Sequence, residues 1–147
     1  MNKPMFYVLS FTWGLPMTLA GALAGGVLRL LGIRPGRWGA CWYFCVGRSW
    51  GGVSLGPVMI ISEDSGRNIK DHEHGHAVQN CWFGPMMLFL VSIPSVVRYW
   101  YREYRKRIGK PCSTAYDAIW FEGQATILGV AYAQKWEKDY AELPKGE

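Results

Sequence analysis

The stretch Asn68–Cys81, NIKDHEHGHAVQNC, places all three histidines of the chain beside two acids, in a protein that is 50% hydrophobic overall. It contains the pattern H-E-x-x-H, formed by His72, Glu73 and His76. Each residue of a helix turns by about 100°, so side chains four positions apart lie on one face. The spacing therefore predicts a helix whose His72 and His76 bind a single metal ion.

Glu73 is one helical step away from the histidine pair. That position predicts a carboxylate beside a metal-activated water, where it can act as the general base. His74 points to the other side of the same helix and is not expected to be a ligand. Gly75 leaves room next to the site for another segment of the chain.

A catalytic zinc usually has three protein ligands and one open position. No histidine follows His76, so the third ligand must be a cysteine or a later acid. Glu122 is a lone acid on an apolar helix, and small residues follow it at i+3, i+4 and i+7: Ala125, Thr126 and Gly129. A small face of this kind lets one helix press against another. We expect Glu122 to be the third ligand.

The pair of motifs, H-E-x-G-H and a later E-x-x-A, resembles the gluzincin class of zinc metallopeptidases, including membrane-embedded relatives of the CAAX-processing and stress-induced proteases. The resemblance covers His72–Ala77 and Glu122–Ala125. It implies zinc on His72, His76 and Glu122, with Glu73 activating water. The chain is also similar to small uncharacterised bacterial membrane proteins with a GHAxQ…GPxxxxxxxxPS pattern, here GHAVQNCWFGPMMLFLVSIPS.

The chain departs from the gluzincin pattern after the ligand glutamate. Many gluzincins carry an acid there that orients a histidine, whereas this chain has Thr126. Asp117 or a backbone carbonyl is the expected substitute. Arg98, Tyr99 and Tyr101 are candidates to stabilise an oxyanion.

The segment Met5–Leu28 carries no charge and is long enough to cross a bilayer. It predicts a retained transmembrane helix ending near Leu31; the competing interpretation is a cleaved signal peptide. Arg29, Arg34 and Arg37 follow it and mark the cytoplasmic side. These features predict a protein of the cell membrane whose active site faces the cytoplasm.

A second apolar segment, Trp82–Val97, separates the two motifs, and the basic, aromatic Arg98–Lys110 follows it. A full crossing would put these cations opposite the first cationic flank, against the positive-inside rule. It would also separate Glu122 from the histidines. We therefore expect residues 82–100 to form a re-entrant or interfacial segment that breaks at Pro94, with the cations on anionic lipid.

The expected fold is mainly α with a small β-hairpin, in which a zincin-like helix pair surrounds the metal site. The hairpin is predicted from ACWYFCV and GGVSLGPVMIIS, whose aromatic and β-branched residues flank a turn. The final long helix is expected at about Ser113–Lys138. Residues 1–33 would be the membrane helix, and 34–147 the metallopeptidase-like domain. The four cysteines are expected to be reduced.

The predicted function is a membrane-associated zinc peptidase that hydrolyses peptide bonds. The alternative is a non-catalytic membrane protein with a structural or vestigial metal site that binds a partner or lipid. The net charge of +5 would suit nucleic acid or anionic membrane, and the long apolar runs favour the membrane. The expected partners are a peptide or protein substrate and the lipid bilayer, without nucleic acid.

Overall fold

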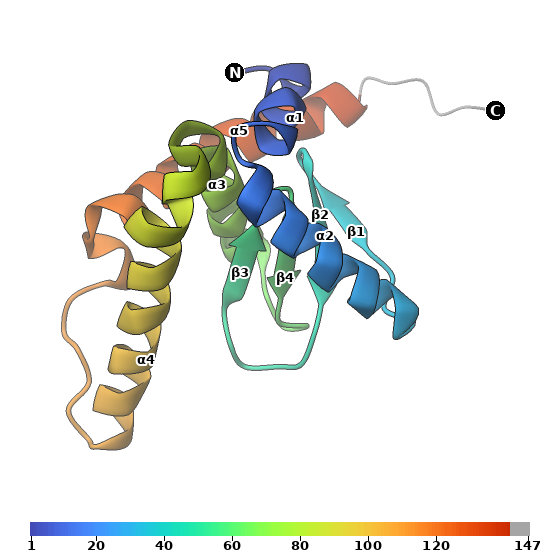
Figure 1. Cartoon of the computed structure of the whole chain (residues 1–147). Helices are drawn as coiled ribbons and strands as arrows, with labels where there is room; N and C mark the ends of the chain where they lie inside the picture. Colours follow the sequence, from blue (N-terminus) through green and yellow to red (C-terminus); the bar gives the residue numbers. More distant parts are fainter. Residues whose placement is uncertain (142–147) are drawn as a thin grey trace.

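Helices make up most of the chain in the computed structural model, which describes residues 1–141 and side chains as far as Trp136 (Figure 1). The α-helices are α1 Lys3–Phe11, α2 Leu15–Leu30, α3 Arg67–Phe83, α4 Ile93–Arg107 and α5 Trp120–Ala141. The strands are β1 Gly36–Trp38, β2 Cys41–Cys45, β3 Gly52–Leu55 and β4 Val58–Ile61. Short turns of helix are η1 Gly84–Met86, the π-helical η2 Leu88–Ser92, and η3 Tyr116–Ala118.

The four strands form one sheet in the order β1-β2-β4-β3. β1 and β3 run antiparallel to their neighbours, while β2 and β4 are parallel. The predicted β-hairpin is therefore only partly right, because the second apolar stretch is itself a hairpin. Its turn lies at Gly56-Pro57, where Gly56 has a φ of +62° that favours glycine. β4 then returns between β2 and β3, which leaves β3 at the edge.

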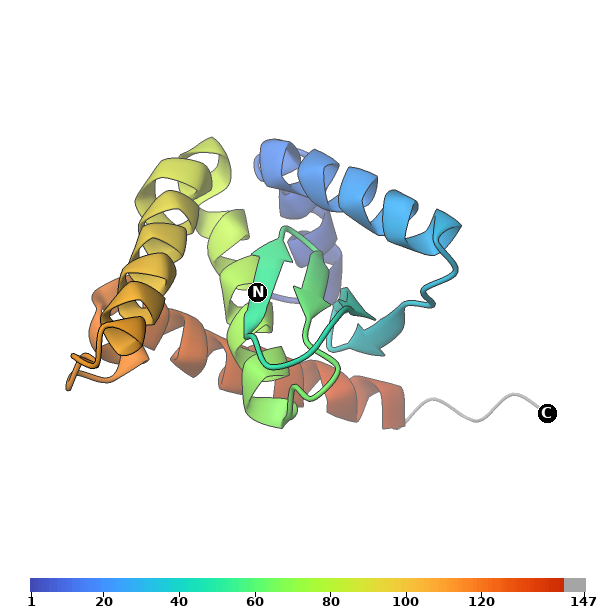
Figure 2. The same ribbon diagram turned by 90° about the horizontal axis from the view of Figure 1, so that it is seen from below.

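The sheet lies between two helical layers (Figures 1 and 2). α2 packs on one face through Gly21 and Gly25, where added side chains would meet Leu55 and Phe44. α3 covers the other face, and α5 crosses behind it. The main core joins buried side chains from α1, the sheet, α3 and α5: Phe6, Ala40, Cys41, Met59, Ala77, Val78, Cys81 and Trp136.

The helix pair α3 and α5 crosses at unusually short range. A Cβ atom on Gly75 would lie 1.8 Å from the carbonyl oxygen of Ala125, and one on Gly129 would lie 1.7 Å from that of Asp71. Both distances are far inside van der Waals contact, and both involve backbone that has no rotamer to change. The small face predicted at Ala125 and Gly129 is confirmed as the contact between the two helices.

The uncharged N-terminal segment forms two helices with a bend of 92° between them, where the sequence predicted one span. The bend follows Thr12 and is fixed at Gly14, whose carbonyl oxygen accepts a hydrogen bond of 3.2 Å from Asn80 Nδ2. Pro16 lies in the first turn of α2, where a missing N–H costs nothing. The bend thus has a tertiary cause.

A second pair of helical segments is bent as well. Residues 67–86 and 88–107 meet at 117°. The turn begins at Gly84, which has a φ of +53° and lies against the Trp13 ring. The expected break at Pro94 is therefore wrong, because the chain turns ten residues earlier. Pro94 instead lies in the first turn of α4, directly after the π-helical turn.

No single helix within residues 1–141 is both long and apolar enough to cross a bilayer, although each bent pair passes that test by length and composition. The span Met5–Leu31 and the division at residue 33 therefore stay predictions. The last helix starts at Trp120 rather than Ser113, because residues 112–119 form a loop and η3 against α4. Residues 142–147 of the predicted second domain lie outside the described part of the chain.

Substituting Gly129 tests the helix crossing. Gly129→Ala forces α5 away from the Asp71 carbonyl, and we expect it to cost at least about 3 kcal/mol of the free energy of unfolding or to prevent cooperative folding. Gly26→Ala is the matched control, because a Cβ at that helical position meets nothing within 4 Å. It should be neutral or stabilising by up to about 1 kcal/mol. Circular dichroism during chemical denaturation measures both, and equal stabilities would contradict the tight crossing.

Candidate metal centre

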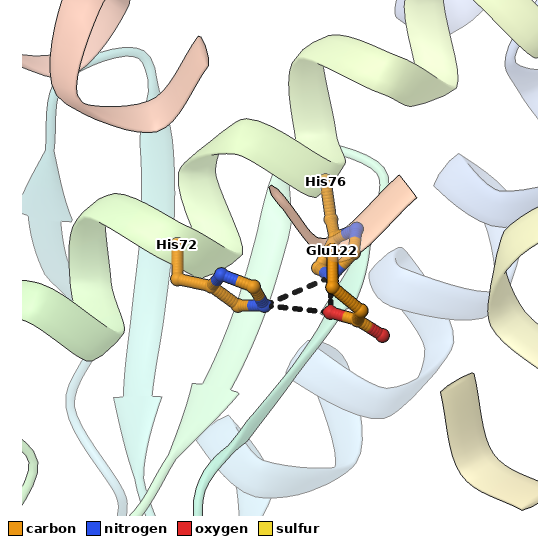
Figure 3. Close-up of side chains that lie close together, drawn as sticks. All are labelled: His72, His76 and Glu122. Atoms are coloured by element: carbon orange, nitrogen blue, oxygen red, sulfur yellow. Dashed lines mark hydrogen bonds and ion pairs between the residues drawn. The ribbon is translucent and has the colours of Figure 1, made fainter. Parts of the chain in front are cut away.

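Three side chains from two helices converge on one point, as Figure 3 shows. His72 and His76 project from α3, and Glu122 projects from the first turn of α5. The Oε2 atom of Glu122 lies 2.9 Å from His72 Nε2 and 3.2 Å from His76 Nε2, and the two nitrogens are 3.2 Å apart. These three residues form the group in the described part of the chain whose ligand atoms lie close enough together to hold a metal ion.

Thr126 orients His72. Its Oγ1 lies 3.0 Å from His72 Nδ1 and donates its own hydrogen to the carbonyl oxygen of Glu122 at 3.2 Å. The hydroxyl is therefore left to accept, and Nδ1 must carry the hydrogen. The Nε2 atom of neutral His72 then presents a lone pair to the centre. Thr126 thus does what we expected of Asp117 or a backbone carbonyl.

Gln79 orients His76 in the same sense. Its Nε2 donates to the carbonyl oxygen of Phe121 at 2.8 Å and to Gln124 Oε1 at 3.0 Å. Its Oε1 therefore faces His76 Nδ1, at 2.8 Å, as an acceptor. The hydrogen of neutral His76 is again on Nδ1, and its Nε2 lone pair also faces the centre.

The centre consequently brings together three acceptor atoms. Two imidazole lone pairs and a carboxylate oxygen at these distances repel one another unless positive charge lies between them. A tetrahedral ion with bonds of about 2.0 to 2.1 Å holds its ligand atoms roughly 3.3 Å apart, close to the observed triangle. Donor types, tautomers and spacing all fit a divalent transition-metal ion with three protein ligands.

The pKa values also show that the site favours positive charge. Burial lowers the pKa of His76, but the close contact with the Glu122 carboxylate and the charges of Glu73 and Glu122 outweigh it and raise the pKa above its ordinary value. Burial likewise opposes ionisation of Glu122, and the close contacts with the two histidines outweigh that effect, so its pKa lies well below the usual range. The carboxylate stays ionised although the side chain is fully buried.

The other carboxylate oxygen of Glu122, Oε1, accepts a hydrogen bond from a residue of α4. Ser95 Oγ donates a hydrogen bond to Oε1, and the Tyr116 hydroxyl lies 3.0 Å from Ser95 Oγ. Because the serine hydrogen is used on Glu122, Tyr116 is the donor in that second bond. Burial raises the pKa of Tyr116 to about 12, so it keeps its proton. Oε2 is thereby left to face the histidines.

Glu73 lies on the side of α3 that faces the sheet. Its side chain is 5% exposed and lies against Gly52 of the edge strand β3, where a Cβ would be only 2.7 Å from Glu73 Cγ. Burial raises the pKa of Glu73, the nearby His76 and His72 lower it, and the net shift is upward. A carboxylate with a raised pKa beside a metal centre has the proton affinity of a general base.

The other predicted residues lie apart from the centre. His74 is buried against Phe6 and Trp136, where burial lowers its pKa to about 3, and it does not belong to the cluster. All four cysteines are free, and none belongs to the cluster. Arg98 donates to the carbonyl oxygen of Tyr116 and so supports the site indirectly.

Sequence reasoning missed four residues that hold the ligands: Gln79, Ser95, Tyr116 and Thr126. Two of them, Gln79 and Ser95, had a signal as the polar positions of the GHAxQ…GPxxxxxxxxPS pattern. Gln79 also follows His76 at i+3, a spacing that places both side chains on one helix face. Thr126 stands where many gluzincins carry an acid that orients a histidine, so its position had a signal although its role was not expected. Tyr116 reaches the site only through tertiary contacts.

Comparison with known proteins identifies no relative. No protein-family model matches the chain, and neither the curated proteins nor the solved structures include a significant match to it. The chemistry of the site must therefore be inferred from its own geometry.

Thr126→Val tests the proposed orientation of His72. The valine has nearly the same shape but cannot accept the Nδ1 hydrogen, so the affinity for a divalent ion should fall by about 10- to 100-fold while the fold is kept. Titration with Co²⁺, followed by its visible absorption, measures the affinity. Thr114→Val changes an exposed loop residue and is the control. It should bind Co²⁺ with the affinity of the wild type. An unchanged affinity in Thr126→Val would contradict the assigned hydrogen bond.

Proposed function

We propose that the protein is a zinc-dependent peptidase. The observation that carries the proposal is the convergence of His72 Nε2, His76 Nε2 and Glu122 Oε2 to within 3.2 Å of one another, beside the buried carboxylate of Glu73. Two neutral histidines and one carboxylate are a ligand set typical of catalytic zinc, which keeps a fourth position open. The resemblance of the two motifs to gluzincins points the same way.

A zinc ion bound by these three residues would supply Lewis acidity and lower the pKa of a water molecule to about 7. The protein's own part begins with Glu73, which accepts a proton from the attacking water and passes it to the leaving amine. Its raised pKa suits both transfers. Thr126, Gln79 and Ser95 hold the three ligands in their productive orientations.

The edge strand β3 offers a place for the substrate. Within residues 1–141 it pairs with β4 alone, so its other edge can accept an extended peptide through main-chain hydrogen bonds. Gly52 in this strand lets the Glu73 carboxylate lie against the backbone. A peptide added to β3 would therefore pass close to the general base. An upstream edge strand is also what the gluzincin resemblance implies.

Glu73→Gln separates catalysis from metal binding. The amide keeps the shape of the side chain but cannot take a proton, so peptide hydrolysis should fall by about 10²- to 10⁴-fold while one zinc per chain is retained. Elemental analysis gives the zinc content, and mass spectrometry of a broad peptide library gives the cleavage rate. Glu63→Gln, at an exposed acid paired with Arg48, is the control and should cleave normally.

The same experiment decides the alternative function. A wild type and a Glu73→Gln variant that both hold zinc and both leave the library uncleaved would favour a structural metal site in a non-catalytic membrane protein. Cleavage that persists in Glu73→Gln would instead remove Glu73 from the mechanism.

We further propose that the protein resides in the cell membrane with its active site on the cytoplasmic side. The support is the uncharged segment 5–28 together with Leu30, because their large apolar side chains remain exposed on α1, on α2 and in the turn between them. These residues are Met5, Val8, Phe11, Trp13, Leu15, Leu19, Leu23, Val27 and Leu30. Exposed apolar surface on this scale marks a protein or membrane contact, and the arginines that follow it favour the cytoplasmic leaflet.

Thiol labelling checks this topology. Cys45 and Cys112 are partly exposed and flank the metal site in sequence, so both should react with an impermeant maleimide in inside-out vesicles and be protected in right-side-out vesicles. Cys41 is fully buried and serves as the unlabelled control in the folded protein. Labelling of Cys45 and Cys112 from opposite sides would contradict the proposed arrangement.

A further inference from the structure

Helix α4 has its polar and apolar faces reversed relative to a helix that packs on a core. None of its fifteen residues is buried. Its large apolar side chains recur at helical spacing and form one face, which we call the α4 stripe: Ile93, Val97, Trp100 and Tyr104. Their exposed fractions run from 47% to 62%. Helix α4 projects from the rest of the molecule in Figure 1, and the described side chains, residues 1–136, leave the stripe about half exposed or more.

The opposite face of α4 holds the helix to the protein through polar contacts. Arg98 donates to the carbonyl oxygens of Ala115 and Tyr116, at 3.0 and 3.2 Å, and Arg102 donates to that of Thr114 at 2.8 Å. Ser95, one turn before Arg98, binds Glu122. The cations that usually face water are thus directed at the 112–118 loop, and the apolar stripe is directed away from it.

The surroundings of the stripe indicate what covers it. Trp100 and Tyr104 are the aromatic residues typical of a membrane–water interface. Arg105, Lys106, Arg107 and Lys110 cluster at the C-terminal end of the helix, where an anionic headgroup would be attracted. At the other end, the exposed Leu88, Phe89 and Leu90 of η2 continue the apolar surface, and no charged residue occurs from Trp82 to Val97.

We propose that α4 lies flat on an anionic lipid surface with its stripe buried among the acyl chains, and that this docking holds the metal site at the membrane boundary. Since Ser95 touches Glu122 from the face opposite the stripe, the site would stand about one helix diameter, roughly 10 Å, from the lipid surface. The substrates it selects are then peptide segments that adjoin a membrane anchor. This statement about substrates rests on the proposed peptidase function; the docking does not.

Lipid photolabelling tests the docking. Vesicles of phosphatidylglycerol and phosphatidylcholine that carry a diazirine on the acyl chain should label Val97, Trp100 and Tyr104 and spare Arg98 and Arg102, as mapped by mass spectrometry. The labelling should be weaker at high salt, and weaker with vesicles of phosphatidylcholine alone than with vesicles that contain phosphatidylglycerol. Labelling of both faces, or of neither, would overturn the proposal. So would cross-links between the stripes of two copies without vesicles, which would show that a second chain covers this face.

A pair of glutamates on the stripe separates docking from catalysis. Val97→Glu with Trp100→Glu should reduce the α4 labelling by about tenfold or more. The same change should slow hydrolysis of a vesicle-anchored peptide and leave zinc content and hydrolysis of a soluble peptide unchanged. Ile127→Glu with Val130→Glu is the matched control at the same spacing on exposed positions of α5, and should behave as the wild type. Equal loss in both pairs would contradict a specific role for α4.

Should the wild type cleave no peptide, the peptidase proposal fails while the labelling pattern still decides the docking. If the Val97→Glu, Trp100→Glu variant cleaves soluble and anchored peptides at the same rates as the wild type, the docking has no role in substrate choice. The peptidase function stands in that case.

Discussion

The close crossing of α3 and α5 is the constraint on which the rest of the structure depends. Gly75 and Gly129 let the two backbones approach to distances that no side chain would permit. Only at that separation can Glu122 place its carboxylate oxygen within 3.2 Å of both histidine nitrogens. Because of the glycines, the two helices bring three acceptor atoms together in one cluster. A cation bound there would relieve their mutual repulsion.

The cluster is held by polar contacts from several parts of the chain. Gln79 and Thr126 fix the hydrogens of the two imidazoles on the outer nitrogens, and Ser95 occupies the outer oxygen of Glu122. Each contact removes one way in which a ligand could turn away from the centre. Because buried polar groups without partners are costly, such a network also stabilises one arrangement of α3, α4 and α5 over others.

Beside its apolar core, the protein buries polar groups around one site and exposes apolar side chains on several helices. Glu73, His76, Gln79 and Glu122 are buried around the site, while many large apolar side chains of α1, α2, η2 and α4 face outward. A buried ionic site and an exposed apolar surface each cost free energy in water. A metal ion at the first and lipid at the second would offset both costs, and α4 connects the two through Ser95.

The sequence alone determined the motif helix, the face shared by His72 and His76, and the role expected of the small residues after Glu122, because helical periodicity is a local property. It also located β-rich stretches, but not their order, since the parallel pairing of β2 with β4 depends on contacts across the whole sheet. It placed the break of the apolar segment at Pro94, whereas packing of Trp13 against Gly84 sets the actual bend. The sequence pattern pointed to position 126 but not to Thr126 itself as the group that orients His72, and Tyr116 entered the site only through the tertiary structure. Their hydrogen bonds join residues 54 and 21 positions apart, and no local pattern encodes such a distance.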